Sequence, residues 1–344
     1  MKVLVTGGGG FLGFWIVKKL LAKNYEVYNY SRNHYSHLED LGIKTFCGDL
    51  NDREALELAL ENIDAIFHVA ALAGVWGKAQ DYMETNFEGT KSLVDLAISK
   101  KIKYFIYTST PSVVFGKDDI LGADESLDFP DNYLTAYAHS KSLAEKYVLE
   151  NTSADFKALA IRPHLIWGPG DPHLFPRLLR KAREGKLKRV GEGENLVDII
   201  YVENAADAHI MAFEKLLEIS SLSGNAYFIG QERPVSLWDF INQVLVLDGQ
   251  EEIESSISFN LAYKIGFIFE MVYKLLGITK PEPPMTRFIA TQLAKSHYFS
   301  HAKAYNDFQF KPVVTIEEGL KKYFDLKKEA QNYFKNMDLA DSIN

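Results

Sequence analysis

A run of glycines directly after the first apolar segment constrains the fold of this chain more than any other feature. Lys2–Thr6 has the apolar, β-branched character of a buried strand, and Gly7–Gly10 and Gly13 follow it. Phe11–Lys23 carries apolar residues at helical spacing. A strand, a glycine-rich turn and a helix in this order are typical of the first unit of a doubly wound α/β fold, where the helix N-terminus receives a phosphate.

The alternation of strands and helices continues to about residue 165. The further strands that the sequence predicts are Glu26–Tyr30, Lys44–Cys47, Ala65–Val69, Tyr104–Ser109 and Ala158–Arg162. The helices predicted between them are Arg53–Glu61, Tyr82–Lys100 and Ala136–Asn151. This rhythm predicts a Rossmann-like parallel sheet of the α/β class.

The domain organisation follows from where this rhythm stops. We expect a dinucleotide-binding domain over residues 1–165, with strands from later residues able to complete its sheet. Beyond it, Gly/Pro-containing loops and isolated short elements predict a smaller, irregular substrate lobe over 166–335 and a tail over 336–344.

Composition excludes several classes of function. The net charge of -8 argues against a nucleic-acid partner, and the lone Cys47 can form neither an intramolecular disulfide nor a thiolate metal site. We therefore expect no metal. The N-terminus shows no secretory signal pattern, so a cytoplasmic protein is the expectation.

One apolar passage, Phe259–Ile278, stands out from the rest of the second half. Lys264, Glu270 and Lys274 interrupt it, so it is a poor candidate for a membrane span. Four interpretations stay open: core packing, a homodimer contact, the wall of an acyl tunnel, and peripheral contact with a membrane. A homodimer is the expected assembly.

The end of the second predicted strand concerns the choice of cofactor. Ser31 and Arg32 stand where an NAD enzyme usually places a carboxylate on the adenosine ribose. Arg32 could instead pair with a 2′-phosphate, which favours NADP(H); NAD(H) and an ordinary surface arginine remain the alternatives. The residues that follow the first four predicted strands are expected to bind the cofactor. They are Gly7, Gly10, Phe11, Leu12, Gly13, Ser31, Arg32, Asp49, Leu50, Ala70 and Ala71.

A phenol and an ammonium define the predicted catalytic site. Tyr137 and Lys141 are four residues apart in a predicted helix, hence on one face, where the cation favours the phenolate. Thr108, Ser109 and Thr110 stand at the end of an upstream strand, where a hydroxyl could share a substrate carbonyl with the phenol. Tyr323 and Lys327 repeat the spacing without such a hydroxyl partner, and we expect a surface helix there.

Several motifs together resemble the 3β-hydroxysteroid dehydrogenase branch of the extended short-chain dehydrogenases/reductases. They are T-G-G-G-G-F-L-G from residue 6, Y-T-S-T-P-S-V-V-F-G from 107, Y-A-H-S-K from 137 and R-P-H-L-I-W-G-P-G-D from 162. Within the branch, A-G-V-W-G from 73 and N-L-V-D-I-I-Y-V-E-N-A-A-D-A-H from 195 look like bacterial 2-alkyl-3-oxoalkanoate reductases, and also like sterol-4-carboxylate 3-dehydrogenases.

The resemblance implies roles for individual residues. It makes Tyr137 the proton donor, Lys141 its activator and a ligand of the nicotinamide ribose, and Thr110 the hydroxyl member of the triad, where the family more often has serine. It adds Tyr137, Lys141, Pro163 and His164 to the residues predicted to bind the cofactor.

Two further positions bear on the substrate. Asn86 matches a family asparagine, although a buried helix-packing role fits it almost as well. Val197 replaces the arginine that nucleotide-sugar members carry before the aspartate matching Asp198, which argues against a sugar epimerase.

The leading hypothesis is an oxidoreductase that uses NADP(H) to reduce the 3-keto group of an apolar β-keto acid. One alternative is an NAD(P)-dependent 3β-hydroxysteroid or sterol-4-carboxylate 3-dehydrogenase. The other is a catalytically silent NADP(H)-sensing or scaffold protein. A basic cluster over 177–189 is either a solvated helix face, a receptor for a substrate carboxylate or a contact for an acidic partner or anionic lipid.

Overall fold

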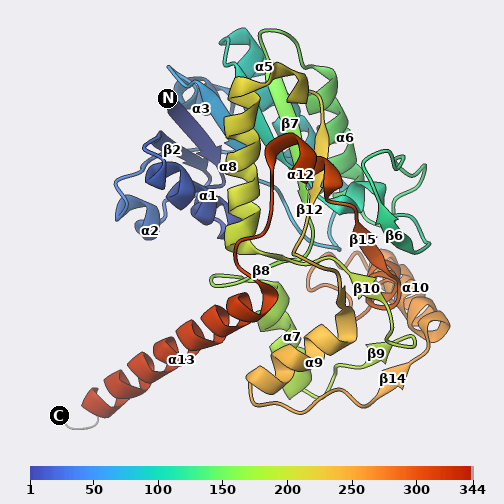
Figure 1. Cartoon of the computed structure of the whole chain (residues 1–344). Coiled ribbons are helices and arrows are strands. Elements are labelled where there is room, and N and C mark those ends of the chain that lie inside the picture. The colour runs from blue at the N-terminus through green and yellow to red at the C-terminus, as the bar shows by residue number, and fades with distance from the viewer. Residues whose placement is uncertain (342–344) are drawn as a thin grey trace.

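A parallel sheet of seven strands forms the centre of the larger lobe in the computed structural model (Figure 1). The structure describes residues 1–341, and the side chains of residues 1–328. The strand order is β12-β7-β5-β4-β1-β2-β3, which confirms the predicted Rossmann-like α/β class. The strands are β1 (Lys2–Thr6), β2 (Glu26–Ser31), β3 (Lys44–Cys47), β4 (Ala65–His68), β5 (Tyr104–Thr108), β7 (Lys157–Pro163) and β12 (Ala226–Ile229).

Helices cover both faces of this sheet because both faces are apolar. In β1, Val3 and Val5 belong to the hydrophobic cluster on one face, and Leu4 belongs to the cluster on the other. The first face is covered by α1 (Phe11–Ala22) and α8 (Val202–Glu218), and the second by α3 (Arg53–Ala59), α5 (Gly89–Ser99) and α6 (Ala136–Glu150).

The helix predicted over 82–100 is interrupted. The chain instead forms α4 (Ala79–Tyr82), a π-helical turn η1 (Met83–Glu88) and then α5. Within η1, the buried Asn86 side chain accepts a hydrogen bond from the Leu72 backbone amide (2.7 Å) and donates to the Leu72 carbonyl (3.0 Å) and Ser140 Oγ (3.0 Å). Asn86 therefore ties the loop after β4 to α6, the packing role that the sequence left open.

The smaller lobe is built mainly from the chain beyond residue 165. Its helices are α7 (Leu174–Arg183), α9 (Leu237–Leu247), α10 (Phe259–Leu275) and α11 (Arg287–Ala294). Its strands are β8 (Ile166–Trp167), β9 (Arg189–Val190), β10 (Leu196–Val197), β11 (Ile200–Tyr201), β13 (Val235–Ser236), β14 (Ser256–Ile257) and β15 (His297–Phe299), with β6 (Ile120–Ala123) added from the first half.

The C-terminal elements connect the two lobes. The helix α12 (Ala302–Phe308) lies against β12 of the main sheet. The long helix α13 (Ile316–Asp341) buries Leu320 and Phe324 in the smaller lobe and then projects away from the body of the protein (Figure 1). Residues 336–341 of the predicted tail belong to this helix, and 342–344 lie outside the described residues.

Across the described part of the chain, no helix combines the length and the apolar character that a transmembrane span requires.

Candidate active site

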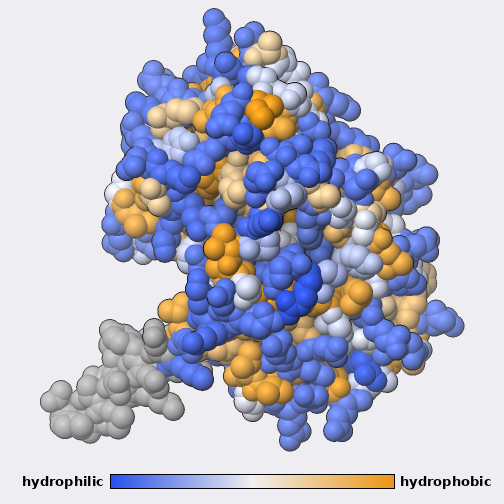
Figure 2. Space-filling model, in the orientation of Figure 1, coloured by the Kyte–Doolittle hydropathy of each residue, from blue (hydrophilic) through white to orange (hydrophobic). Residues whose placement is uncertain are grey.

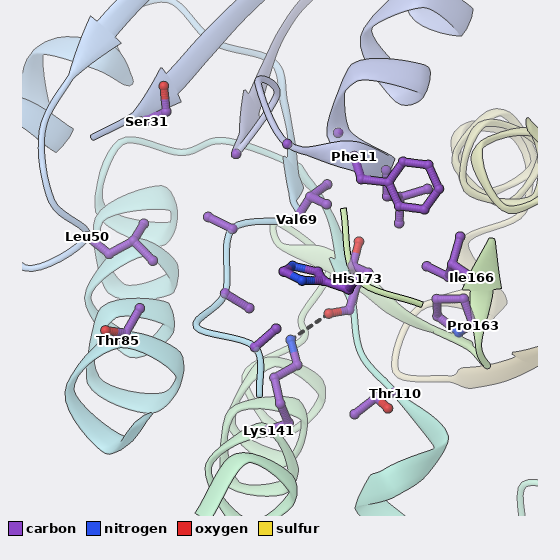
Figure 3. Close-up of a pocket in the computed structure, with 18 of the residues that line it drawn as sticks. Phe11, Ser31, Leu50, Val69, Thr85, Thr110, Lys141, Pro163, Ile166 and His173 are labelled. Atoms are coloured by element: carbon purple, nitrogen blue, oxygen red, sulfur yellow. Dashed lines mark hydrogen bonds between the residues drawn. The ribbon is translucent and has the colours of Figure 1, made fainter. Parts of the chain in front are cut away.

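A cavity of about 480 Å³ opens at the carboxyl ends of the central strands, between the two lobes (Figure 3). Most residues predicted from the sequence to form the site line this cavity. They are Gly7, Gly10, Phe11, Leu12, Gly13, Ser31, Arg32, Asp49, Leu50, Ala70, Ala71, Thr110, Tyr137, Lys141 and Pro163. Of the predicted set, His164 alone is absent from the lining.

The glycine turn has the geometry that a dinucleotide pyrophosphate requires. Gly7 has φ +73°, and a Cβ on it would lie 2.9 Å from Ala70 Cα. A Cβ on Gly13 would lie 2.1 Å from the carbonyl oxygen of Gly7. Gly10 precedes α1 without a side-chain cap, so the first amides of that helix remain available to an anion. The turn therefore fits a dinucleotide.

Two side chains that the sequence interpretation missed hold this turn. Asn29, buried in β2, accepts a hydrogen bond from the Gly8 amide through Oδ1 (2.8 Å). Tyr35 lies so close to Gly9 that a Cβ there would come within 2.1 Å of its Cδ2. Asn29 could have been noticed as a polar residue inside an apolar strand, whereas nothing in the sequence placed Tyr35 beside the glycines.

The end of β2 presents a free cation to the cavity. Arg32 is exposed, and it forms no ion pair with any side chain of residues 1–328. Ser31 beside it accepts a hydrogen bond from Asn29 Nδ2 (2.9 Å) and donates to the Asn33 carbonyl (2.8 Å). The backbone at this end is thus held in place while the guanidinium remains available to a ligand.

Lys141 is buried beneath the cavity, only 3% exposed. Its Nζ donates a hydrogen bond to the Thr108 carbonyl oxygen (2.6 Å; dashed in Figure 3) and lies 4.1 Å from the centre of the Tyr107 ring. Burial lowers the pKa of Lys141 to about 7, and Glu145 opposes this by favouring the ammonium. The side chain can therefore change its charge near neutral pH.

The half-buried Tyr137 side chain lines the same cavity. Burial raises its pKa to about 12, while a hydrogen bond from the Thr110 hydroxyl acts in the opposite direction. This is the reverse of the acidification that the Tyr137–Lys141 spacing predicted. The reason is that burial disfavours the charged form of both groups, and a lysine with a pKa near 7 is a weakened source of positive charge. At neutral pH the phenol keeps its proton.

Thr110 and its neighbours place hydroxyl groups beside that phenol. Thr110 Oγ1 caps the short helix η2 (Pro111–Val114) by accepting a hydrogen bond from the Ser112 amide (3.2 Å). The buried Ser109 also lines the cavity, and its Oγ has no hydrogen-bond partner among the described residues. Ser109, one of the three hydroxyl residues that the sequence offered as partners of the phenol, is therefore a second hydroxyl available to a ligand.

His164 points to a different part of the molecule. Its Nε2 lies 2.7 Å from His297 Nδ1, and His297 Nε2 donates to the Gln292 carbonyl (3.0 Å), so His164 is the donor in the first bond. Burial lowers the pKa of both imidazoles. Successive residues of a strand face opposite sides, so Pro163 reaches the cavity while His164 joins β7 to β15.

The turn before α7 supplies the opposite wall of the cavity. Asp171 accepts hydrogen bonds from the backbone amides of His173 (2.8 Å), Leu174 (3.0 Å) and Phe175 (2.9 Å), so it fixes the start of the helix. His173 is exposed and lines the cavity (Figure 3). The G-P-G-D-P-H segment contained this signal, because an aspartate before an apolar helix is a typical N-terminal cap.

Other charged and aromatic candidates lie outside the cavity. Tyr323 and Lys327 lie on a helix at the surface, α13, as we predicted. The Tyr323 ring centre lies 4.9 Å from that of Phe175 and Lys327 pairs with Asp248, so these contacts anchor the helix on the smaller lobe. The buried Asp198 accepts from the Phe299 amide (2.8 Å) and His301 Nε2 (3.0 Å).

The basic cluster of 177–189 is partly neutralised. Arg177 pairs with Glu282 (2.7 Å) and Arg183 pairs with Asp248 (2.6 Å). These pairs connect α7 to other parts of the smaller lobe.

Comparison with solved structures supports the fold. UDP-glucose 4-epimerase from Thermotoga maritima matches with a TM-score of 0.75 at 21% identity, covering 96% of this chain and 100% of that one. UDP-glucuronic acid 4-epimerase from Bacillus cereus matches with a TM-score of 0.73 at 23% identity, covering 96% and 99%. At such identities the likeness shows the shared architecture alone.

Sequence relatives are more specific. The 2-alkyl-3-oxoalkanoate reductase of Stenotrophomonas maltophilia is 42% identical over 94% of this chain and 98% of its own length, and that of Shewanella oneidensis is 42% identical over 92% and 84%. The sterol-4-alpha-carboxylate 3-dehydrogenase of Mus musculus is 32% identical over 93% and 89%. The model of the 3-beta hydroxysteroid dehydrogenase/isomerase family matches residues 4–261. The chain is an oxidoreductase that belongs to this family.

Proposed function

We propose that this protein uses NADPH to reduce the 3-keto group of an apolar 2-alkyl-3-oxoalkanoate to the hydroxy acid. The observation that carries the proposal is the convergence of three groups on one cavity: the glycine turn, the free Arg32 guanidinium, and the Thr110, Tyr137 and Lys141 side chains. The residues present thus fit both a phosphorylated dinucleotide and a carbonyl to be protonated.

The protein groups have distinct tasks in this reaction. When bound, the cofactor supplies the hydride. Tyr137, which holds its proton at neutral pH, donates it to the oxygen of the reduced ketone, and the Thr110 hydroxyl donates a hydrogen bond to the same oxygen. Lys141 would hold the ribose hydroxyls of the cofactor, as the family resemblance implies. Val69, Ile166 and Leu174 supply apolar walls for alkyl groups.

The names of the relatives support a substrate whose carboxylate is attached to the carbon adjacent to the reacting carbon. A 2-alkyl-3-oxoalkanoate carries its ketone β to a carboxylate, and a sterol-4-carboxylate carries its 3-oxygen in the same relation. Both substrates are therefore β-keto or β-hydroxy acids whose other groups are large and apolar. The sterol acid is the second candidate, since relatives at 32% identity act on it by name.

A substrate panel tests the proposal. Purified protein is assayed with NADPH and with NADH against 2-alkyl-3-keto acids, the matching ketones without a carboxylate, and a sterol-4-carboxylate. We expect turnover of the keto acids with NADPH. Turnover of the sterol acid alone would select the second candidate, and dinucleotide binding without any turnover would indicate a sensing protein.

A further inference from the structure

Three side chains on the lining of the cavity can carry a positive charge. They are Arg32, Lys141 and His173. The outer surface of the protein is largely hydrophilic on the face that Figure 2 shows, whereas apolar residues such as Val69, Ile166 and Leu174 line the cavity. A substrate carboxylate that leaves water for such walls needs a cation or a hydrogen-bond donor beside it. One of the three side chains is therefore expected to receive it.

Arg32 lies too far from the reacting groups to receive this carboxylate. It follows β2, whereas Thr110 follows β5, and both β1 and β4 lie between these two strands. Since neighbouring strands are about 4.8 Å apart, β2 and β5 are separated by about 14 Å, which is longer than an arginine side chain. The carboxylate of a β-keto acid is only two bonds from the ketone carbon. It therefore stays beside Thr110 and Tyr137, out of reach of Arg32.

Lys141 is engaged with protein groups beneath the cavity. Its Nζ donates to the Thr108 carbonyl (2.6 Å) and lies against the ring of Tyr107, and the side chain is almost completely buried. The family resemblance implies that the remaining capacity of this ammonium serves the cofactor ribose. Lys141 therefore leaves the substrate carboxylate to the third side chain.

The His173 imidazole is available to a ligand, while its backbone is fixed. The exposed ring is directed into the cavity (Figure 3) and forms no hydrogen bond or ion pair with any side chain of residues 1–328. The His173 amide donates to Asp171 Oδ1 (2.8 Å), and Trp15 Nε1 donates to the Pro169 carbonyl in the same turn (3.4 Å). The turn is thus held in place before a ligand arrives, which lowers the entropic cost of binding.

The charged groups around His173 already have partners. Asp171 accepts from three backbone amides through both carboxylate oxygens, so it does not occupy the imidazole. Arg177, one turn further along α7, pairs with Glu282 (2.7 Å) and does not line the cavity. The basic cluster of 177–189 therefore does not supply the receptor for a substrate carboxylate.

His173 also lies on the side of the sheet where the ketone is reduced. β7 is the neighbour of β5 on the side away from β2. It ends at Pro163 and leads through β8 into the turn that carries His173. Because Pro163, Ile166 and His173 all line the cavity, this part of the chain forms the wall next to the reacting groups.

We propose that His173 binds the substrate carboxylate and so makes the protein select acids over esters of the same carbon skeleton. An imidazole N–H donates to one carboxylate oxygen in a charge-assisted hydrogen bond. The inference rests on the proposed function, which supplies the β-keto acid. It assigns to His173 the recognition of the acid group, and leaves the proton transfer to Tyr137.

Binding to the protein loaded with cofactor tests this role without turnover. Protein saturated with NADPH is titrated calorimetrically with a 2-alkyl-3-hydroxy acid and with its methyl ester. We expect the wild type to bind the acid more tightly. His173→Leu should weaken binding of the acid by about 10- to 100-fold and affect the ester far less. His173→Lys, which keeps a cation at this position, should restore the preference for the acid.

The matched control is His139→Gln. His139 is an exposed histidine of α6 that stacks on Tyr133 and does not line the cavity. The variant should bind the acid and the ester as the wild type does. A loss of acid binding in this variant as large as that in His173→Leu would overturn the proposal, because the loss would not depend on the cavity.

Three further outcomes would overturn the role of His173. They are equal binding of acid and ester by the wild type, a preference that His173→Leu leaves unchanged, and weaker NADPH binding by that variant in a fluorescence titration. In the last case His173 would contact the diphosphate at the start of α1 instead. Steady-state kinetics separates this inference from the proposed reaction. Turnover of the keto acid with an unchanged acid preference in His173→Leu would remove only the role of His173, whereas binding of the acid that depends on His173 without turnover would remove only the proposed reaction.

Discussion

Burial determines the protonation of the two titratable groups at the end of the cavity. The pKa of Tyr137 rises to about 12 and that of Lys141 falls to about 7, in each case because the charged form loses its hydration. The phenol is therefore a proton donor throughout the neutral range. The lysine changes charge within that range, so its titration should dominate the pH dependence of reduction.

The titration of Lys141 determines the direction in which kcat/KM for ketone reduction changes with pH. Below about 7 Lys141 is an ammonium, and above it the side chain becomes neutral and loses its charge-assisted contacts. We expect kcat/KM for ketone reduction to fall as pH rises through about 7, whereas the proton on Tyr137 remains in place. Lys141→Arg, which stays charged, should abolish that inflection. An inflection that persists in the variant would assign it to another group.

Replacing the phenol separates chemistry from binding. Tyr137→Phe removes the proton donor and keeps the ring, so we expect ketone reduction to fall by about 10²–10⁴-fold. Affinity for NADPH, measured by fluorescence titration, and the thermal unfolding midpoint should change little. Unaltered turnover would rule out Tyr137 as the donor.

Arg32 decides the cofactor preference if it receives a 2′-phosphate. Arg32→Gln removes one charge-assisted contact, which corresponds to about 10- to 100-fold weaker NADPH binding with little effect on NADH. Arg53→Gln is the matched control, because Arg53 is an exposed arginine that forms an ion pair with Glu57 of the same helix. Equal loss for both cofactors would exclude recognition of the phosphate.

At the scale of elements, a buried ion pair fixes α6, which carries Tyr137 and Lys141, against β7. Glu145 is fully buried and Arg162 nearly so; Arg162 Nε donates to Glu145 Oε2 (3.0 Å), and Nη2 contacts Oε1. Breaking such a pair leaves an uncompensated buried charge.

We expect Glu145→Gln to lower the free energy of unfolding by about 3–5 kcal/mol, measured by urea denaturation. The control is Glu57→Gln in the exposed pair on α3, which should change it by at most about 1 kcal/mol. Similar effects of the two substitutions would show that the buried pair contributes no more to the free energy of unfolding than the exposed pair does.

Elements with strong local signals could be predicted from the sequence. Strands such as Lys2–Thr6 and Lys44–Cys47 have the bounds expected from their β-branched, apolar composition. The π-helical turn at Met83–Glu88 could not be predicted, because apolar spacing cannot distinguish a helix from one interrupted by a wider turn. Its cause is tertiary: the Asn86 amide is satisfied by the Leu72 backbone and by Ser140.

At the scale of the whole molecule, the site residues that could be predicted were those that belong to a recognisable sequence motif. The cavity brings Gly7, Arg32 and Tyr137 together because their strands and helices end at one edge of the sheet, which the βαβ order implies. Tyr35 and His173 were missed, since their positions depend on how loops fold over that edge. The rise in the pKa of Tyr137 was also missed, because burial is a property of the assembled molecule.

Contact between the lobes can be tested at Trp76. Trp76→Leu removes the hydrogen bond to the Ile278 carbonyl and the contact with the Tyr273 ring. The loop after β4, which lines the cavity at Ala71 and Ala73, then loses its connection to the end of α10. We expect KM for a long-chain keto acid to rise while KM for NADPH stays unchanged, measured by steady-state kinetics. A parallel rise in both constants would mean that the substitution disturbs the whole cavity.

The sheet that receives the cofactor is finished by a strand from far along the chain. β12 (Ala226–Ile229) pairs with β7, and Tyr227 on it donates a hydrogen bond to Asp307 of α12 (2.9 Å). During synthesis, the nascent chain must therefore emerge from the ribosome past residue 308 before this edge is both paired and covered. A truncated product that stops before β12 would expose the unpaired edge of β7 to other strands, and chaperones are the natural recipients of such an intermediate.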